Sequence, residues 1–399
     1  MPLTSPVLLA GLVLGALALP VVAVVGWRRL PGGPVVSGAQ RLVLVVACQV
    51  LAVLATAAAL NDDFGFYTSW QDLRVSIDGP GAAALGGPPP APLPVDATRA
   101  PRETPPGRDG VAPWLHAVAP AAVTPRLATA AAAPLAPGAS GYRLLRVTFS
   151  ASGLHTPAVV LLPPQYFDPA FATARFPVLF AFNGYPGTTG PWLSQLHLPD
   201  SLAALPPPRG ELPFVAVLLE QNVVPPRDTE CTDVPGGPQV AAFLGQQVPA
   251  RLFADLRLRA DRAGWATIGY STGGFCAAKL ALLYPHLFGE GASLAGYFTA
   301  LQDGTTGDLY GSERYRALNS PVWRVQHLPV PDVSLLVMTT RQDGESYVSS
   351  EQFLRVVRPP LRVSALVLPQ GGHNFGVWSD VLPDVLRWLQ ARAAPLRAA

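Results

Sequence analysis

The stretch Trp265-Ala-Thr-Ile-Gly-Tyr-Ser271-Thr-Gly-Gly-Phe-Cys-Ala-Ala-Lys-Leu-Ala-Leu-Leu-Tyr284 decides the fold of this chain. It predicts a short β-strand, a tight turn with the pattern G-x-S-x-G, and an Ala/Leu-rich helix. The glycines flank the turn because a Cβ there would crowd it, and the turn lifts the hydroxyl of Ser271 out of the sheet. Ser271 is therefore a candidate nucleophile. The N–H of Thr272, close to the N-terminus of the following helix, would point at the place where an oxyanion forms.

Further strand patterns lie on both sides of this stretch and alternate with helical ones. Two alternating strands, 142–150 and 156–162, come first and predict a hairpin across Ser152-Gly153. This order predicts an α/β fold with a mostly parallel, doubly wound sheet and an N-terminal antiparallel hairpin. Catalytic residues are then expected on loops at the carboxyl ends of the strands. The later strands are predicted at 177–183, 214–219, 265–269, 291–296, 333–339 and 363–368, the helices at 239–259, 275–284, 349–357 and 378–393, and irregular segments at 188–205 and 299–329.

A serine hydroxyl is a poor nucleophile until a base removes its proton. His373, in Gln370-Gly-Gly-His-Asn-Phe, follows the last predicted strand and precedes the last predicted helix. This is the position of the base in the order Ser…Asp/Glu…His of α/β-hydrolases. A carboxylate is also needed to orient the imidazole, and Asp343 and Glu345 both follow the strand 333–339. Asp343 is preferred because it lies nearer the strand end, and Glu345 is kept as the alternative acid.

The loop after the strand 177–183 is expected to supply a second oxyanion donor. It reads Asn183-Gly-Tyr-Pro-Gly-Thr-Thr-Gly, in which the glycines allow close approach of the backbone. The N–H of Tyr185 is the candidate donor. The alternative is that Tyr-Pro-Gly forms a simple turn.

The N-terminal residues contain two apolar runs, from Pro6 to Val25 and from Leu42 to Leu60. Each is long enough to span a bilayer, and the arginines in this region all lie between the two runs. The positive-inside rule then places the connector in the cytoplasm and the rest of the chain outside. A signal peptide is the competing interpretation. The predicted organisation is a two-helix membrane anchor (1–61), an interfacial segment and Pro/Ala/Gly-rich linker (62–140) and an extracytoplasmic catalytic domain (141–399).

The charge and cysteine content excludes several classes of function. The net charge is +2, and no basic stripe suggests a nucleic-acid partner. The three cysteines lack zinc-ligand spacing, so no metal site and no cofactor are expected. Outside the cell, Cys231 and Cys276 are expected to form a disulfide, the alternative being two unpaired thiols. Cys48 lies in an apolar run and is expected to be a buried small residue.

Four motifs carry a family resemblance: Asn183-Gly-Tyr-Pro-Gly, Arg227-Asp-Thr-Glu-Cys-Thr-Asp-Val-Pro-Gly-Gly, Gly269-Tyr-Ser-Thr-Gly-Gly and Gly371-Gly-His-Asn. They resemble an actinobacterial, membrane-anchored branch of the esterase D-like α/β-hydrolases, a family that includes the antigen 85 mycolyltransferases. The resemblance implies Ser271 as nucleophile, His373 as base, and Tyr185 and Thr272 as oxyanion donors. The esterase D branch has an aspartate as the acid, which supports Asp343. The mycolyltransferase branch has a glutamate set further from its strand, which supports Glu345.

Together these observations predict a cell-surface serine hydrolase that acts on a small-molecule, lipid or glycan carboxylic ester through an acyl-enzyme. Two alternatives remain open. One is an acyltransferase to an envelope glycan or lipid, similar to the mycolyltransferases. The other is an inactive hydrolase fold that serves as a binding module.

Overall fold

The computed structural model describes residues 5–27, 30–64, 70, 73, 133–134, 140–206 and 212–393. The chain forms two compact units, one of residues 1–83 with 369–377 and the other of residues 84–368 with 378–399. Most of the predicted linker, 62–140, lies outside the described residues. The predicted domain boundaries therefore stay a prediction.

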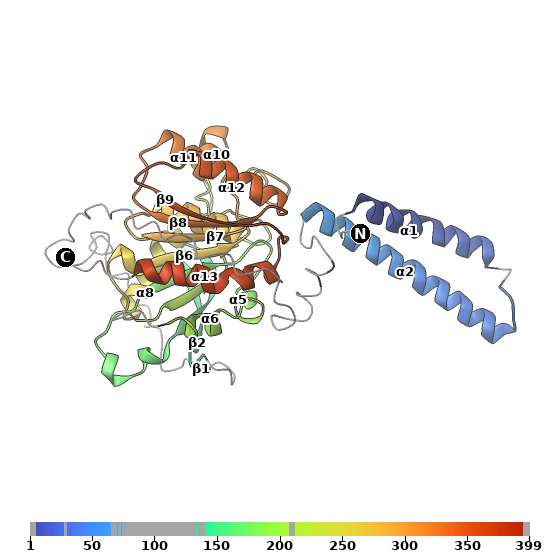
Figure 1. Cartoon of the computed structure of the whole chain (residues 1–399), viewed down its shortest axis with the longest axis horizontal. Coiled ribbons are helices and arrows are strands. Elements are labelled where there is room, and N and C mark those ends of the chain that lie inside the picture. Colours follow the sequence, from blue (N-terminus) through green and yellow to red (C-terminus); the bar gives the residue numbers. More distant parts are fainter. Residues whose placement is uncertain are drawn as a thin grey trace. The chain divides into compact units, whose positions relative to one another are not determined.

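The first unit contains two long apolar helices, α1 (Pro6–Gly26) and α2 (Pro34–Phe64). Both are long and apolar enough to cross a membrane. The helices lie side by side (Figure 1), and the side chain of Leu51 on α2 packs over Gly15 on α1. Such a pair is compatible with a membrane anchor or a signal sequence.

The second unit is built on one nine-stranded sheet with the order β1-β2-β3-β5-β4-β6-β7-β8-β9. The strands β1 to β3 and the contact of β3 with β5 are antiparallel, and all pairs from β5 to β9 are parallel. The predicted doubly wound sheet with an antiparallel hairpin at its start is confirmed. The strands are β1 (Ala133–Pro134), β2 (Arg143–Ala151), β3 (Leu154–Leu162), β4 (Val178–Phe182), β5 (Val215–Leu219), β6 (Trp265–Tyr270), β7 (Glu290–Leu294), β8 (Ser334–Thr340) and β9 (Arg362–Leu368).

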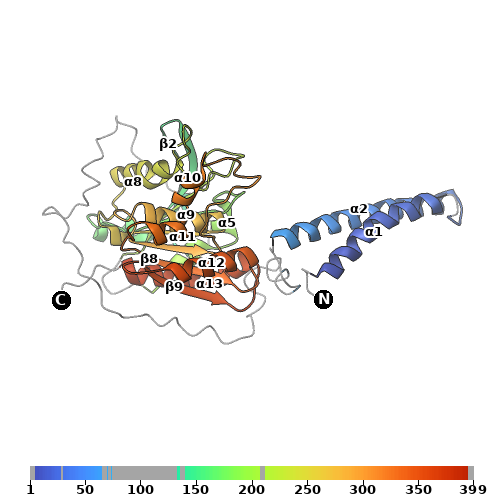
Figure 2. The same ribbon diagram turned by 90° about the horizontal axis from the view of Figure 1, so that it is seen from above.

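Helices cover the sheet on both faces (Figures 1 and 2), which explains why its central strands are apolar throughout. Every residue of β4, β5 and β6 is buried. The helices and helical turns are η2 (Pro164–Tyr166), η3 (Pro169–Phe171), α5 (Gly190–Ser194), α6 (Leu198–Ala203), α7 (Val240–Ala242), η4 (Phe243–Gln247), α8 (Val248–Asp255), η5 (Arg262–Gly264), α9 (Thr272–Leu283), α10 (Glu313–Leu318), α11 (Pro321–His327), α12 (Gly344–Val356) and α13 (Phe375–Ala393).

The helix predicted at 239–259 is present from Val240 to Asp255, as α7, the π-helical turn η4 and α8, and ends four residues earlier than predicted. Pro249 explains the π-helical turn, because it has no N–H to bond to the preceding turn. One sequence prediction about helices was wrong. The segments predicted to be irregular contain α5, α6, α10 and α11. Ser312 caps α10 by accepting the N–H of Tyr315, a signal that the sequence did carry.

Candidate active site

The predicted turn between β6 and α9 is present and places Ser271 in an unusual backbone conformation. Ser271 has φ 56° and ψ −129°, a positive φ that non-glycine residues rarely adopt. Such a residue costs about 1–3 kcal/mol and persists only where its surroundings determine it. Here the Ser271 N–H donates to Leu294 O on β7 (2.9 Å), and Ser271 O accepts the N–H groups of Gly274 (2.8 Å) and Phe275 (3.1 Å). The backbone therefore holds the serine at the end of β6.

Close packing around this turn explains its glycines. A Cβ on Gly269 would lie 2.0 Å from Gly273 O, and a Cβ on Gly273 would lie 2.2 Å from Phe182 O at the end of β4. Both distances are far below van der Waals contact, so a side chain at either position would separate the helix from the strands. The reason given from the sequence for these two glycines is confirmed.

The loop after β4 lies directly against the candidate nucleophile. A Cβ on Gly184 would lie 2.9 Å from Ser271 Cβ, so Tyr185 follows a residue in contact with the serine. The Asn183 side chain steadies this loop by donating to Gly184 O (2.7 Å), and the Tyr185 hydroxyl donates to Pro226 O (2.6 Å). The loop after β4 is therefore fixed next to the candidate nucleophile.

The structure separates the two candidate acids by burial. Asp343 is buried at the end of β8, where its N–H donates to Thr340 Oγ1 (3.1 Å), whereas Glu345 is exposed in the first turn of α12. Only β7 separates β8 from β6 in the sheet, and the three strands are parallel. Asp343 and Ser271 consequently follow the carboxyl ends of strands at the same edge of the sheet. These positions favour Asp343 over Glu345.

His373 lies in the loop between β9 and α13, as its place in the sequence indicated. Its side chain is half-buried. Within the same loop Asn374 donates its N–H to Gly372 O (3.1 Å), and its side-chain oxygen accepts the Val377 N–H in the first turn of α13 (3.1 Å). A loop with these internal bonds limits the backbone freedom of His373.

Behind the nucleophile turn lies a cluster of buried charged residues that the sequence analysis did not assign. Glu230 is fully buried, and its carboxylate accepts hydrogen bonds from the hydroxyls of Tyr297 (2.5 Å) and Tyr310 and from the Leu301 N–H (3.0 Å). Lys279, the only lysine of the chain, is also fully buried and donates to Glu230 O (2.9 Å). A lone lysine on an otherwise apolar helix was the signal that could have revealed this cluster.

Burial dominates the titration of these groups. It raises the pKa of Glu230 to about 7, against the lowering effect of the Tyr297 and Tyr310 hydrogen bonds. It raises the pKa of Asp228 to about 6 and lowers the pKa of Lys279 to about 7, while the charge of Glu230 favours the lysine cation. The loop that carries Asp228 and Glu230 is therefore held in a poorly solvated environment next to α9.

A disulfide joins this loop to the nucleophile helix. Cys231 and Cys276 are bonded with their Cα atoms 5.7 Å apart, and both are buried. The predicted pairing is confirmed. Glu230 and Cys231 both have positive φ (46° and 49°), so the chain bends sharply where the disulfide begins. The bond ties the residues 228–233 to the second turn of α9.

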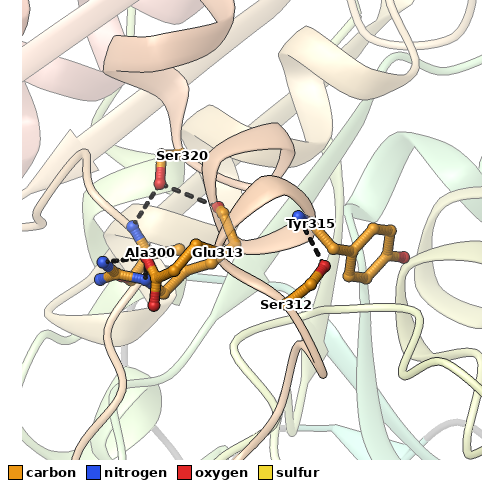
Figure 3. A network of polar contacts seen from close by, with 6 residues as sticks. Ala300, Ser312, Glu313, Tyr315 and Ser320 are labelled. Atoms are coloured by element: carbon orange, nitrogen blue, oxygen red, sulfur yellow. Dashed lines mark hydrogen bonds and ion pairs between the residues drawn. The ribbon is translucent and has the colours of Figure 1, made fainter.

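The segment after β7 covers the same loop from the other side. The Tyr315 hydroxyl on α10 donates to Asp233 O (2.6 Å). Figure 3 shows that Ser320 accepts the Ala300 N–H (2.9 Å), which holds α11 to the chain just after β7, and that Ser312 accepts the Tyr315 N–H. The charged loop is thus enclosed between α9 and the segment 297–320.

We expect Glu230→Ala to lower the free energy of unfolding by about 3–5 kcal/mol, because it leaves three donors without their buried acceptor and removes the negative charge that favours the Lys279 cation. Chemical denaturation of the full chain in detergent, followed by circular dichroism, measures this change. The matched control is Glu313→Ala, since Glu313 is exposed and pairs with Arg316 at the surface, where an ion pair contributes less than about 1 kcal/mol. Equal denaturation midpoints for Glu230→Ala and the wild type would contradict a stabilising role for the cluster.

Comparison with known proteins places the chain in a family. Residues 151–389 match the Esterase family, described as "Putative esterase". The fold is similar to that of an S-formylglutathione hydrolase from Agrobacterium tumefaciens (TM-score 0.55, 16% identity, covering 64% of this chain and 98% of that one). It is also similar to a ferulic acid esterase (TM-score 0.54, 18% identity, covering 64% and 99%). No curated protein sequence matches significantly. Because the family match spans more than half of its residues, the chain belongs to the Esterase family.

Proposed function

We propose that this protein is a membrane-anchored serine esterase that hydrolyses carboxylic esters outside the cytoplasm. Ser271 is the nucleophile, His373 the general base and Asp343 the acid that orients the imidazole. The N–H groups of Thr272 and Tyr185 form the oxyanion hole. The observation that carries the proposal is the positive φ of Ser271 between β6 and α9, which supports its role as an exposed nucleophile.

In the proposed mechanism His373 removes the proton of the Ser271 hydroxyl as its oxygen attacks the ester carbonyl. The carbonyl oxygen becomes an oxyanion, which accepts hydrogen bonds from the Thr272 and Tyr185 N–H groups. His373 then passes its proton to the departing alcohol, and an acyl-enzyme remains on Ser271. A water molecule activated by His373 releases the acid and restores the serine. Asp343 offsets the positive charge that the imidazole carries in each half-reaction.

Two observations support a location outside the cytoplasm. Arg41, in the early part of α2, stacks on Trp27 just after α1, with 5.3 Å between the guanidinium carbon and the ring centroid, and arginines at the ends of membrane spans are most frequent on the cytoplasmic side. The disulfide between Cys231 and Cys276 is typical of oxidising compartments. Both are consistent with an anchor whose two ends face outward.

The direct test is labelling of the full-length protein in detergent with a fluorophosphonate probe, followed by mass spectrometry. We expect the label on Ser271 and a labelling rate at least 100-fold lower in His373→Ala, because the serine then lacks its base. His155→Ala is the matched control, since His155 hydrogen-bonds Ser150 on the hairpin (3.0 Å) and should leave labelling unchanged. A folded wild type that takes no label would contradict the esterase and favour a binding module.

A further inference from the structure

The side chain of Thr272, the residue after the nucleophile, is held by the buried charged loop. Its hydroxyl donates to Asp228 Oδ2 (3.3 Å) and lies 3.4 Å from the Tyr297 hydroxyl. The Tyr297 hydroxyl is itself fixed by its short bond to Glu230 (2.5 Å). Thr272 is 6% exposed and Asp228 is 3% exposed, so these bonds form away from water. The first residue of α9 is therefore held by hydrogen bonds to residues that are distant in the sequence.

Asp228 is held rigidly at its other atoms. Its second carboxylate oxygen accepts the Glu230 N–H (2.9 Å), and its own N–H donates to Thr305 O (3.1 Å). The disulfide at Cys231 and the bond from Lys279 to Glu230 O fix the following residues to α9. A carboxylate fixed in this way can transmit its position to the Thr272 hydroxyl.

The position of Thr272 matters because of its place in the helix. The first N–H groups of an α-helix have no partner within the helix, and Ser271 O already accepts the N–H groups of Gly274 and Phe275. The Thr272 N–H belongs to this first turn and directly follows the candidate nucleophile in the chain. An error of about 1 Å in the position of a catalytic group can cost about 100-fold in rate.

We propose that Asp228 is a positioning residue of the esterase reaction, which holds the Thr272 hydroxyl so that the Thr272 N–H stays directed at the developing oxyanion. This inference rests on the proposed function and adds to it a residue that never touches the substrate. It predicts that Asp228 acts through the hydroxyl of Thr272 and affects the transition state more than substrate binding. The loop 228–233 then has a catalytic purpose besides its contribution to stability.

A double-mutant cycle in the full-length protein tests the proposal, with kcat and KM measured on a short p-nitrophenyl ester. We expect Asp228→Ala and Thr272→Val each to lower kcat at least tenfold while KM stays within about twofold, because an oxyanion donor acts in the transition state. The kcat of the double variant should lie no more than about threefold below that of the slower single variant, since both changes break the same hydrogen bond between Thr272 and Asp228. Thr272→Ser, which keeps the hydroxyl, should recover most of the rate lost in Thr272→Val.

Asp233→Asn is the matched control, because Asp233 lies in the same loop but accepts the Ala242 N–H (2.9 Å) instead of contacting Thr272. Its kcat should stay within about twofold of the wild type. A folded Asp228→Ala protein with wild-type kcat, or losses that multiply in the double variant, would overturn the proposal. If Asp228→Ala does not fold, equal kcat values for Thr272→Ser and Thr272→Val would overturn it. A wild type that neither labels nor hydrolyses the ester would instead refute the esterase itself.

Discussion

Replacing Ser271 by alanine is expected to lower kcat for hydrolysis of a short p-nitrophenyl ester by about a millionfold, the loss typical of removing the nucleophile of a serine hydrolase. The residual rate should come only from the oxyanion donors and from binding, because no acyl-enzyme can form. The methyl group of alanine fits where the serine Cβ contacts Gly184, so the fold should be retained. The decisive measurement is kcat of the purified full-length variant, together with an acylated peptide containing position 271 that is found in the wild type and absent from the variant.

Ser150→Ala serves as the control for this experiment. Ser150 lies on β2, which is separated from β6 by β3, β5 and β4, and it is exposed. The kcat of Ser150→Ala should equal that of the wild type within about twofold. Residual activity of Ser271→Ala above about one hundredth of the wild type would show that another group performs the attack.

The second large effect on kcat is expected at Asp343, the proposed acid that orients His373. We expect Asp343→Asn to lower kcat by about 10,000-fold, because a neutral amide cannot offset the imidazolium charge and favours the wrong tautomer of the base. Glu345→Gln should keep kcat within about twofold, since Glu345 is exposed in the first turn of α12. Both substitutions preserve side-chain shape, so the pair isolates the effect of charge at two positions, one just before α12 and one in its first turn.

Burial is the physical reason to expect this difference. An exposed carboxylate is screened by water, whereas the charge of a buried one such as Asp343 acts in a low-dielectric environment. Circular dichroism should confirm that both variants are folded. A large loss of kcat in Glu345→Gln with little loss in Asp343→Asn would assign the acid to Glu345, as in the mycolyltransferase-like pattern.

The parts of the fold that were predictable depend on short-range physics. The β6 strand, the turn at Ser271 and the start of α9 follow from the sterics of neighbouring residues, which the Gly269 and Gly273 contacts illustrate. The β2–β3 hairpin follows from the alternation of its strands and the positive φ values of Ser152 and Gly153. In contrast, α10 and α11 are too short to show a clear hydrophobic period, so the sequence predicted an irregular segment in their place.

The same distinction applies to the candidate site. The sequence by itself determined the candidate nucleophile, the base and two possible acids, because each stands at a recognisable place relative to a strand. The tertiary structure alone distinguished buried Asp343 from exposed Glu345. It alone also brought Asp228 to the hydroxyl of Thr272, across 44 residues of chain. Such contacts depend on how distant segments pack together, and no local pattern of residues encodes that packing.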